Sequence, residues 1–264
     1  MTSILHRLAM ACLVVGVLPT THADDAPLLL HLQPAGYPAS EGTFPSPLPA
    51  DGWLALVCVD GACHLAPARA WVERATVETH DGTVDGEVLR GAAPPGTLAL
   101  LRGLAGVQAG PVATEWINPR FPDFSAGDWA GEHGDAAPPT LAWPAMDGGP
   151  RRLSLMIEEA SPESCWSGDC IARWLLDGDG EPVVLAHTAG DPAVYGRAGL
   201  LAPADALVWA GDLDGDGRLD LLLRPQPRPD YLDLRLLLGR DRPATGEWPA
   251  SLQFYWWDPS NPGC

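Results

Sequence analysis

Four aspartates recur at a fixed spacing in the segment AGDLDGDGRLDLLL, residues 210–223. Calcium takes about six to eight hard oxygen ligands, and a chain that wraps the ion can offer them from alternate residues. Gly217 permits the sharp turn that would bring the next carbonyl oxygen inward. The spacing therefore predicts a calcium site whose ligands are the carboxylates of Asp212, Asp214, Asp216 and Asp220 and the main-chain carbonyl of Arg218.

The residues around these aspartates separate the segment from an EF-hand. With Asp212 as position 1, Leu223 stands at position 12, where an EF-hand has a bidentate glutamate. Apolar residues on both sides, 207–210 and 219–223, predict strands rather than helices. A calcium loop within a β-hairpin is therefore expected. The alternative is an acidic turn without metal, in which the carboxylates would raise one another's pKa values.

The longer segment LVWAGDLDGDGRLDLLL, residues 207–223, resembles the FG-GAP or VCBS repeat. This repeat is the calcium loop of integrin α-chain propeller blades and of many bacterial secreted proteins. The resemblance implies calcium ligation by Asp212, Asp214, Asp216 and Asp220, with the Arg218 carbonyl, inside a β-hairpin.

A propeller needs several such copies, because each blade buries its faces against its neighbours. The best second candidate is LLDGDGEPVV, residues 175–184, which has Leu175 and Val183 where the first and last ligands would stand. Neither side chain can bind calcium, so this segment is more typical of a hairpin turn. The sequence predicts a single metal loop and not a full propeller.

Two pairs of cysteines share the spacing C-x4-C, Cys58 with Cys63 and Cys165 with Cys170. Each pair encloses a turn-forming dipeptide, Asp-Gly or Ser-Gly. In a hairpin with a two-residue turn, the second residue pair out from the turn is non-hydrogen-bonded, and its Cα separation suits a disulfide. Two cross-strand disulfides are predicted, with metal ligation as the rival reading. Cys264 is left over: it is free, bonds another chain, or replaces one of these partners.

The N-terminal residues have the order of a secretory signal peptide. Arg7 precedes an apolar segment at about residues 8–18, and small residues follow up to Ala23. We expect cleavage after Ala23 and a periplasmic or secreted protein without a membrane span. A lipoprotein anchored at Cys12 is the alternative, although Cys12 lies inside the apolar segment.

Composition narrows the possible partners. The formal net charge is −18, and every basic residue other than histidine is an arginine. Such a chain cannot neutralise a row of phosphates, so nucleic acid is excluded as a partner. The acidic surface favours multivalent cations.

Short apolar or alternating segments separated by glycine and proline predict a mainly β protein. In LDLRLLL, residues 232–238, we expect the leucines to face the core and Asp233 and Arg235 to face out. We predict antiparallel, sandwich-like sheets with one calcium-binding hairpin loop. The expected divisions are a signal peptide (1–23), an N-terminal β-rich domain (24–117), a Pro/Gly-rich linker or loop (118–150) and a C-terminal β domain that carries the metal loop (151–264).

Signals for catalysis are weak. The histidines are scattered, and neither a nucleophile elbow nor a phosphate loop is present in the sequence. Alternation places Tyr255 and Trp257 on one face of a C-terminal strand, as a possible ligand platform, and Phe254 and Trp256 on the other. The main hypothesis is an exported, calcium-stabilised β protein that binds or scaffolds a protein or glycan partner. A carbohydrate-active hydrolase with structural calcium and a calcium-dependent glycan-binding module are the alternatives.

Overall fold

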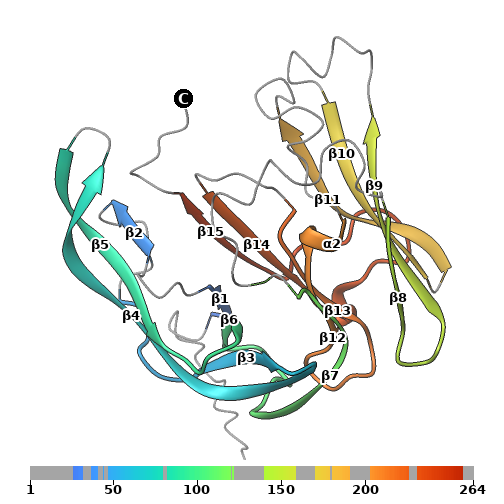
Figure 1. Ribbon diagram of the computed structural model, residues 1–264, viewed down its shortest axis with the longest axis horizontal. Helices are drawn as coiled ribbons and strands as arrows, with labels where there is room; N and C mark the ends of the chain where they lie inside the picture. Colours follow the sequence, from blue (N-terminus) through green and yellow to red (C-terminus); the bar gives the residue numbers. More distant parts are fainter. Residues whose placement is uncertain are drawn as a thin grey trace, which may run out of the picture.

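A computed structural model shows a mainly β protein with antiparallel sheets, as predicted, and the part of the chain that it describes does not form a full propeller (Figure 1). Helical structure in the described residues is limited to α2 (Pro203–Ala206) and the 3-10 turn η3 (Gly239–Asp241). The structure describes residues 26–31, 37–40, 44, 47–79, 82–119, 121, 140–158, 170–178, 180–190, 203–225 and 231–257.

The larger sheet has eleven strands. Nine of them follow the order β1-β6-β3-β4-β7-β12-β13-β14-β15, and β5 joins β2 to the long strand β4. The strands are β1 (Leu28–Leu30), β2 (Tyr37–Ser40), β3 (Trp53–Val59), β4 (Ala62–Thr79), β5 (Gly82–Ala92), β6 (Thr97–Arg102), β7 (Gly110–Ile117), β12 (Leu207–Asp212), β13 (Asp220–Leu223), β14 (Tyr231–Leu237) and β15 (Leu252–Trp257).

This sheet curves into a nearly closed, barrel-like shape, because its end strands β1 and β15 contact each other. Its concave side holds the main hydrophobic core, to which residues from β1 through β15 contribute. Trp53, Leu100, Trp209 and Leu234 are among the fully buried members.

A second, four-stranded sheet has the order β11-β10-β9-β8. A second core cluster joins apolar residues of this sheet, including Leu153 and Trp174, to residues of β12, β13 and β14 such as Leu221 and Leu237. The two sheets therefore pack face to face over β12–β14, in a sandwich-like manner. The strands are β8 (Thr140–Pro144), β9 (Pro150–Glu158), β10 (Cys170–Gly178) and β11 (Gly180–Gly190).

The strands shared by both layers have apolar side chains on both faces. On β13, Leu222 belongs to the barrel-side core, whereas Leu221 and Leu223 belong to the core between the sheets. A continuous apolar run is the pattern of a strand covered on both faces. This explains why the leucines behind the aspartates do not alternate with polar residues.

Strand pairing crosses the predicted division into two domains. β7, from the first segment, pairs antiparallel with β12, from the second, with Trp209 opposite Ile117. The domain division stays a prediction, and this ladder joins the two segments that it separates. The last part of the expected linker, residues 140–144, forms β8, where Trp143 is buried against the second sheet's core.

Alternation on β14 is confirmed, because Leu232, Leu234, Leu236 and Leu238 all belong to the barrel-side core, but Asp233 on the opposite face is not exposed. Asp233 is only 3% exposed, and its carboxylate accepts hydrogen bonds from the Arg235 guanidinium at 2.7 Å and from the Gln253 amide at 2.7 Å. The expected exposure of Asp233 was wrong, because the prediction assumed a solvated outer face, whereas β14 has a covered surface on each side. The hairpin predicted for residues 175–184 is present as the β10–β11 connection.

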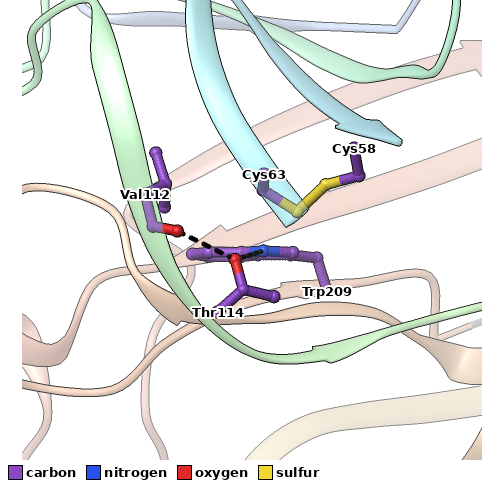
Figure 2. The surroundings of a disulfide bond; sticks show 5 residues. All are labelled: Cys58, Cys63, Val112, Thr114 and Trp209. Carbon is purple, nitrogen blue, oxygen red and sulfur yellow. Dashed lines mark hydrogen bonds between the residues drawn. A yellow bond between two sulfur atoms is a disulfide. The ribbon is translucent and has the colours of Figure 1, made fainter. Parts of the chain in front are cut away.

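The first predicted disulfide is present at the tip of the β3–β4 hairpin (Figure 2). Asp60 and Gly61 both have positive φ, which is the type I′ geometry that suits the twist of a two-residue hairpin. Cys58 therefore lies opposite Cys63 with a Cα separation of 4.2 Å, as in a non-hydrogen-bonded pair.

Several predicted features lie outside the described residues. They are the signal peptide, Cys12, Cys165 and Cys264, together with the side chains of Cys170, Trp256 and Trp257. The second disulfide therefore stays a prediction.

Candidate metal centre

The aspartate segment connects two buried strands. β12 ends at Asp212, β13 begins at Asp220, and the register pairs Gly211 with Asp220 at the base of the loop. The predicted β-hairpin around the loop is therefore confirmed. Gly215 and Gly217 have φ values of 75° and 78°, a backbone conformation that other residues rarely adopt.

Three of the four predicted carboxylates come together. One oxygen from each of Asp212, Asp214 and Asp216 lies within 4.8 Å of the others. Asp212 and Asp214 are half-buried, and Asp216 is exposed. This is the donor chemistry that calcium prefers: hard oxygens from alternate residues of one short loop.

Backbone N–H groups hold the Asp212 carboxylate at the centre of the loop. The N–H groups of Gly215 and Asp216 donate to its Oδ1 at 2.8 and 3.1 Å, and that of Gly217 donates to its Oδ2 at 2.9 Å. The two oxygens of a carboxylate together have about four lone-pair positions, so these bonds leave capacity for a cation. The loop is therefore ordered by its own backbone before any metal is considered.

Arg218 lies just outside this group. Its backbone N–H donates to Asp216 Oδ1 at 2.8 Å, and its guanidinium is 4.0 Å from the Asp216 carboxylate with a side chain that is 63% exposed. Ligation through the Arg218 carbonyl stays a prediction.

The fourth aspartate, Asp220, is not part of the group formed by the Asp212, Asp214 and Asp216 carboxylates, which we call the trio. It is fully buried, and its two oxygens each accept a backbone N–H at 2.6 Å, Oδ2 from Leu213 and Oδ1 from Gly239. In this structure its carboxylate joins the start of the loop to η3. Burial raises the pKa of Asp220 to about 7, against the two N–H donors, which lower it; the charges of Asp214 and Asp216 add to the increase.

The side chain of Asp214 is well covered, although the residue as a whole is half-buried. Its side chain is 4% exposed, and its Oδ2 accepts a hydrogen bond from Arg240 Nη1 at 3.0 Å. Burial and then the neighbouring charge of Asp216 raise the pKa of Asp214, whereas Arg240 lowers it. A bound cation would favour the charged form of this carboxylate.

The base of the loop requires a glycine at position 211. A Cβ built there would lie 2.2 Å from the carbonyl oxygen of Ala113 and 2.5 Å from Cζ2 of Trp209. No flexible side-chain end is available to move, because the first contact is backbone on β7 and the second is a buried ring.

We therefore expect Gly211→Ala to lower the free energy of unfolding by about 3 kcal/mol, since overpacked sites cost about 1–3 kcal/mol and this one meets backbone. Urea denaturation measures the change. Gly149→Ala is the matched control, because Gly149, like Gly211, lies outside the positive-φ region and its added Cβ would meet only a side-chain oxygen of Asp147, at 3.3 Å. Equal effects of the two substitutions would contradict the close approach at Gly211.

A buried ion pair near the same strands was not predicted from the sequence. Glu115 on β7 accepts from Arg151 Nε at 2.9 Å, from Trp143 Nε1 at 3.1 Å and from the Met146 N–H at 3.0 Å. The Glu115 side chain is 1% exposed and that of Arg151 is 9% exposed. The pair ties the larger sheet to β8 and β9.

The structure describes only one of the two side chains of the predicted ligand platform, that of Tyr255. Tyr255 is 57% exposed and Phe254 is buried, so Phe254 belongs to the core and Tyr255 lies on the outer face of β15. Tyr255 stays a candidate contact for a ligand, whereas the side chain of Trp257 lies outside the described residues.

Comparison with known proteins gives no match to a family model, a curated protein or a solved structure. The FG-GAP resemblance of residues 207–223 therefore stays a prediction from the sequence. Among the described residues, none of the helical segments has the length and apolar character needed to cross a membrane.

Proposed function

We propose that this protein is an exported, calcium-stabilised β protein with a binding or scaffold role. The observation that carries the proposal is the convergence of Asp212, Asp214 and Asp216 in a hairpin loop whose sequence has the spacing of a calcium loop. The calcium ion would be held by these three carboxylates. Asp220 and the Arg218 carbonyl are proposed to complete its ligands.

The location of the loop supports a structural use of the metal. The loop joins β12 to β13, which are covered by core residues on both faces, and its base contacts η3 through Asp220. The three nearby carboxylates repel one another. Calcium would remove that repulsion and fix the connection between the strands that both layers share.

The binding or scaffold role is proposed from the predicted leader at residues 1–23 together with the metal loop. The partner chemistry that we propose is a protein or glycan outside the cytoplasm. The acidic charge of −18 weighs against a nucleic acid or another strongly acidic partner.

Thermal unfolding in calcium and in chelator tests the calcium proposal. At about 100 times its Kd, calcium should stabilise the protein by about 2.7 kcal/mol, which corresponds to roughly 5–10 °C in Tm for a chain of this size. Asp216→Asn should abolish this shift, because it removes the charge of one of the three carboxylates proposed to hold the ion. Asp216 is exposed, so the substitution leaves the core unchanged. Asp51→Asn, an exposed carboxylate that pairs with Arg69, is the matched control and should retain the shift. A wild-type Tm that is equal in calcium and chelator rejects the proposal.

A further inference from the structure

We infer that Arg240 is a built-in counter-ion of the aspartate loop that holds Asp214 when metal is absent and weakens calcium binding. The inference rests on the proposed calcium site and concerns how its affinity is set. Arg240 lies on η3, 26 residues beyond Asp214 in the sequence, so it is not part of the loop itself.

The guanidinium of Arg240 makes two contacts through one nitrogen. Nη1 donates to Asp214 Oδ2 at 3.0 Å and to the main-chain carbonyl of Ala105 at 2.9 Å. A Cβ added to Gly106 would lie 3.4 Å from Asp214 Cβ, so the connection between β6 and β7 packs directly against this aspartate. Arg240 therefore joins three segments at the proposed ligand: η3, the β6–β7 connection and the loop.

The backbone places η3 closely enough for this contact. Gly239 donates its N–H to the buried Asp220 carboxylate, and a Cβ at Gly239 would lie 2.5 Å from Arg218 Cβ and 2.8 Å from the Leu219 carbonyl. The far end of η3 is held by Asp241, whose Oδ2 accepts a hydrogen bond from Ser251 Oγ. Arg240 thus extends from a fixed turn.

The pair that Arg240 forms differs from the other arginine contact at the loop. Arg218 is 4.0 Å from Asp216, and the two side chains are 63% and 29% exposed, so solvent screens that interaction. Arg240 is 35% exposed, but its partner Asp214 is only 4% exposed. The Arg240–Asp214 pair is therefore better shielded from solvent than the Arg218–Asp216 pair. Its electrostatic interaction should have the larger effect on calcium binding at the proposed site.

Arg240 and a bound calcium ion would share the Asp214 carboxylate, and the two cations repel. The repulsion between a divalent ion and a guanidinium on one carboxylate corresponds to roughly tenfold in affinity even when solvent screens it. Conversely, removing Arg240 leaves Asp214 without this cation in the metal-free protein. Loss of Arg240 should thus act in opposite directions on metal-free stability and on calcium affinity.

Calcium titration calorimetry of full-length wild type, Arg240→Gln and Arg240→Lys tests this inference, alongside thermal unfolding in chelator. We expect Arg240→Gln to bind calcium roughly tenfold more tightly than wild type and to have a lower Tm in chelator. Arg240→Lys keeps the charge and should bind with an affinity near that of wild type. Arg69→Gln removes an exposed arginine paired with Asp51 and controls for the change in net charge.

The outcomes separate this inference from the calcium proposal. Binding by Arg240→Gln alone, or tighter binding by it than by wild type, supports the counter-ion role. Equal affinities of wild type and Arg240→Gln, or weaker binding by the variant, overturn the counter-ion role while leaving the calcium site in place. Absence of binding in every variant overturns both. A gain in Arg69→Gln equal to that in Arg240→Gln assigns the effect to net charge and also overturns the inference.

Discussion

Glu115→Ala should lower the free energy of unfolding by about 3–5 kcal/mol, the cost of leaving one partner of a buried ion pair behind. Glu115 accepts hydrogen bonds from Arg151, Trp143 and the Met146 N–H, and its side chain is 1% exposed. The substitution removes the shared acceptor of all three donors. Chemical denaturation followed by tryptophan fluorescence measures the loss.

Two comparisons distinguish this mechanism from a general cost of removing a glutamate. Glu73→Ala removes the partner of Arg90 from an exposed pair with a 2.8 Å contact, and it should cost far less because solvent screens that pair. The double variant Glu115→Leu with Arg151→Met should be more stable than Glu115→Ala, since no buried charge remains. A Glu115→Ala variant as stable as Glu73→Ala would contradict the buried junction between the two sheets.

Replacing His31 with phenylalanine should flatten the loss of stability at acidic pH. Burial, and to a lesser extent the positive charge of Arg224, lowers the pKa of His31 from 6.5 to about 3. The ring lies edge-on to Phe121 with 5.2 Å between centroids. Below pH 6.5 the unfolded chain takes up a proton that the folded protein does not, so stability falls by about 1.4 kcal/mol per pH unit down to about pH 3.

The stability of His31→Phe should therefore fall by about 3 kcal/mol less than that of wild type between pH 7.5 and 4.5. The difference between the two curves is the quantity to measure, because Asp220, with its pKa raised to about 7, acts in the opposite sense over the same range. An exposed histidine on β4, His64, provides the matched control: His64→Gln should leave the wild-type slope in place. Parallel curves for His31→Phe and wild type would show that His31 is not kept neutral by the fold.

The aspartate loop could be predicted because its information is local. The spacing of Asp212, Asp214 and Asp216, with Gly217 between them and Arg218, determines how a short loop turns. The apolar residues on each side determine that strands enter and leave it. The Cys58–Cys63 hairpin could be predicted for the same reason, since its turn and its disulfide bond lie within six residues.

The hydrogen-bond partners of Asp220 could not be predicted from the local spacing of the aspartates. Ligation of the metal by Asp220 stays a prediction, whereas the hydrogen bonds that its two oxygens accept from the backbone N–H groups of Leu213 and Gly239 could not be predicted. Gly239 lies beyond the next strand, so no pattern within the loop indicates it. The partner comes from strand order, which places η3 beside the loop.

The buried position of Glu115 could not be predicted, because a β-bulge determines which face of β7 carries its side chain. The pairing of β7 with β12 goes from Trp116 opposite Ala210 to Thr114 opposite Gly211, which leaves Glu115 as the extra residue. A bulge breaks the alternation on which predictions of strand faces depend. Asp233 has a different cause: alternation on β14 is unbroken, but the face that carries Asp233 is covered by other parts of the protein, which the local sequence does not indicate.

The most direct test of the calcium site is the stoichiometry and affinity of calcium binding to the purified, chelator-stripped protein, measured by equilibrium dialysis with radioactive calcium. We predict one ion per chain for wild type, and none at the same free calcium for the double variant Asp212→Asn with Asp216→Asn. The double variant should retain the β-sheet circular dichroism of wild type, because both substitutions lie at the end of β12 or in its connection to β13; within that connection, Asp212→Asn removes one of the two oxygens that accept backbone N–H groups. Wild-type protein that binds no calcium, or a double variant that still binds one ion per chain, would contradict the assignment of residues 212–220 as a calcium loop.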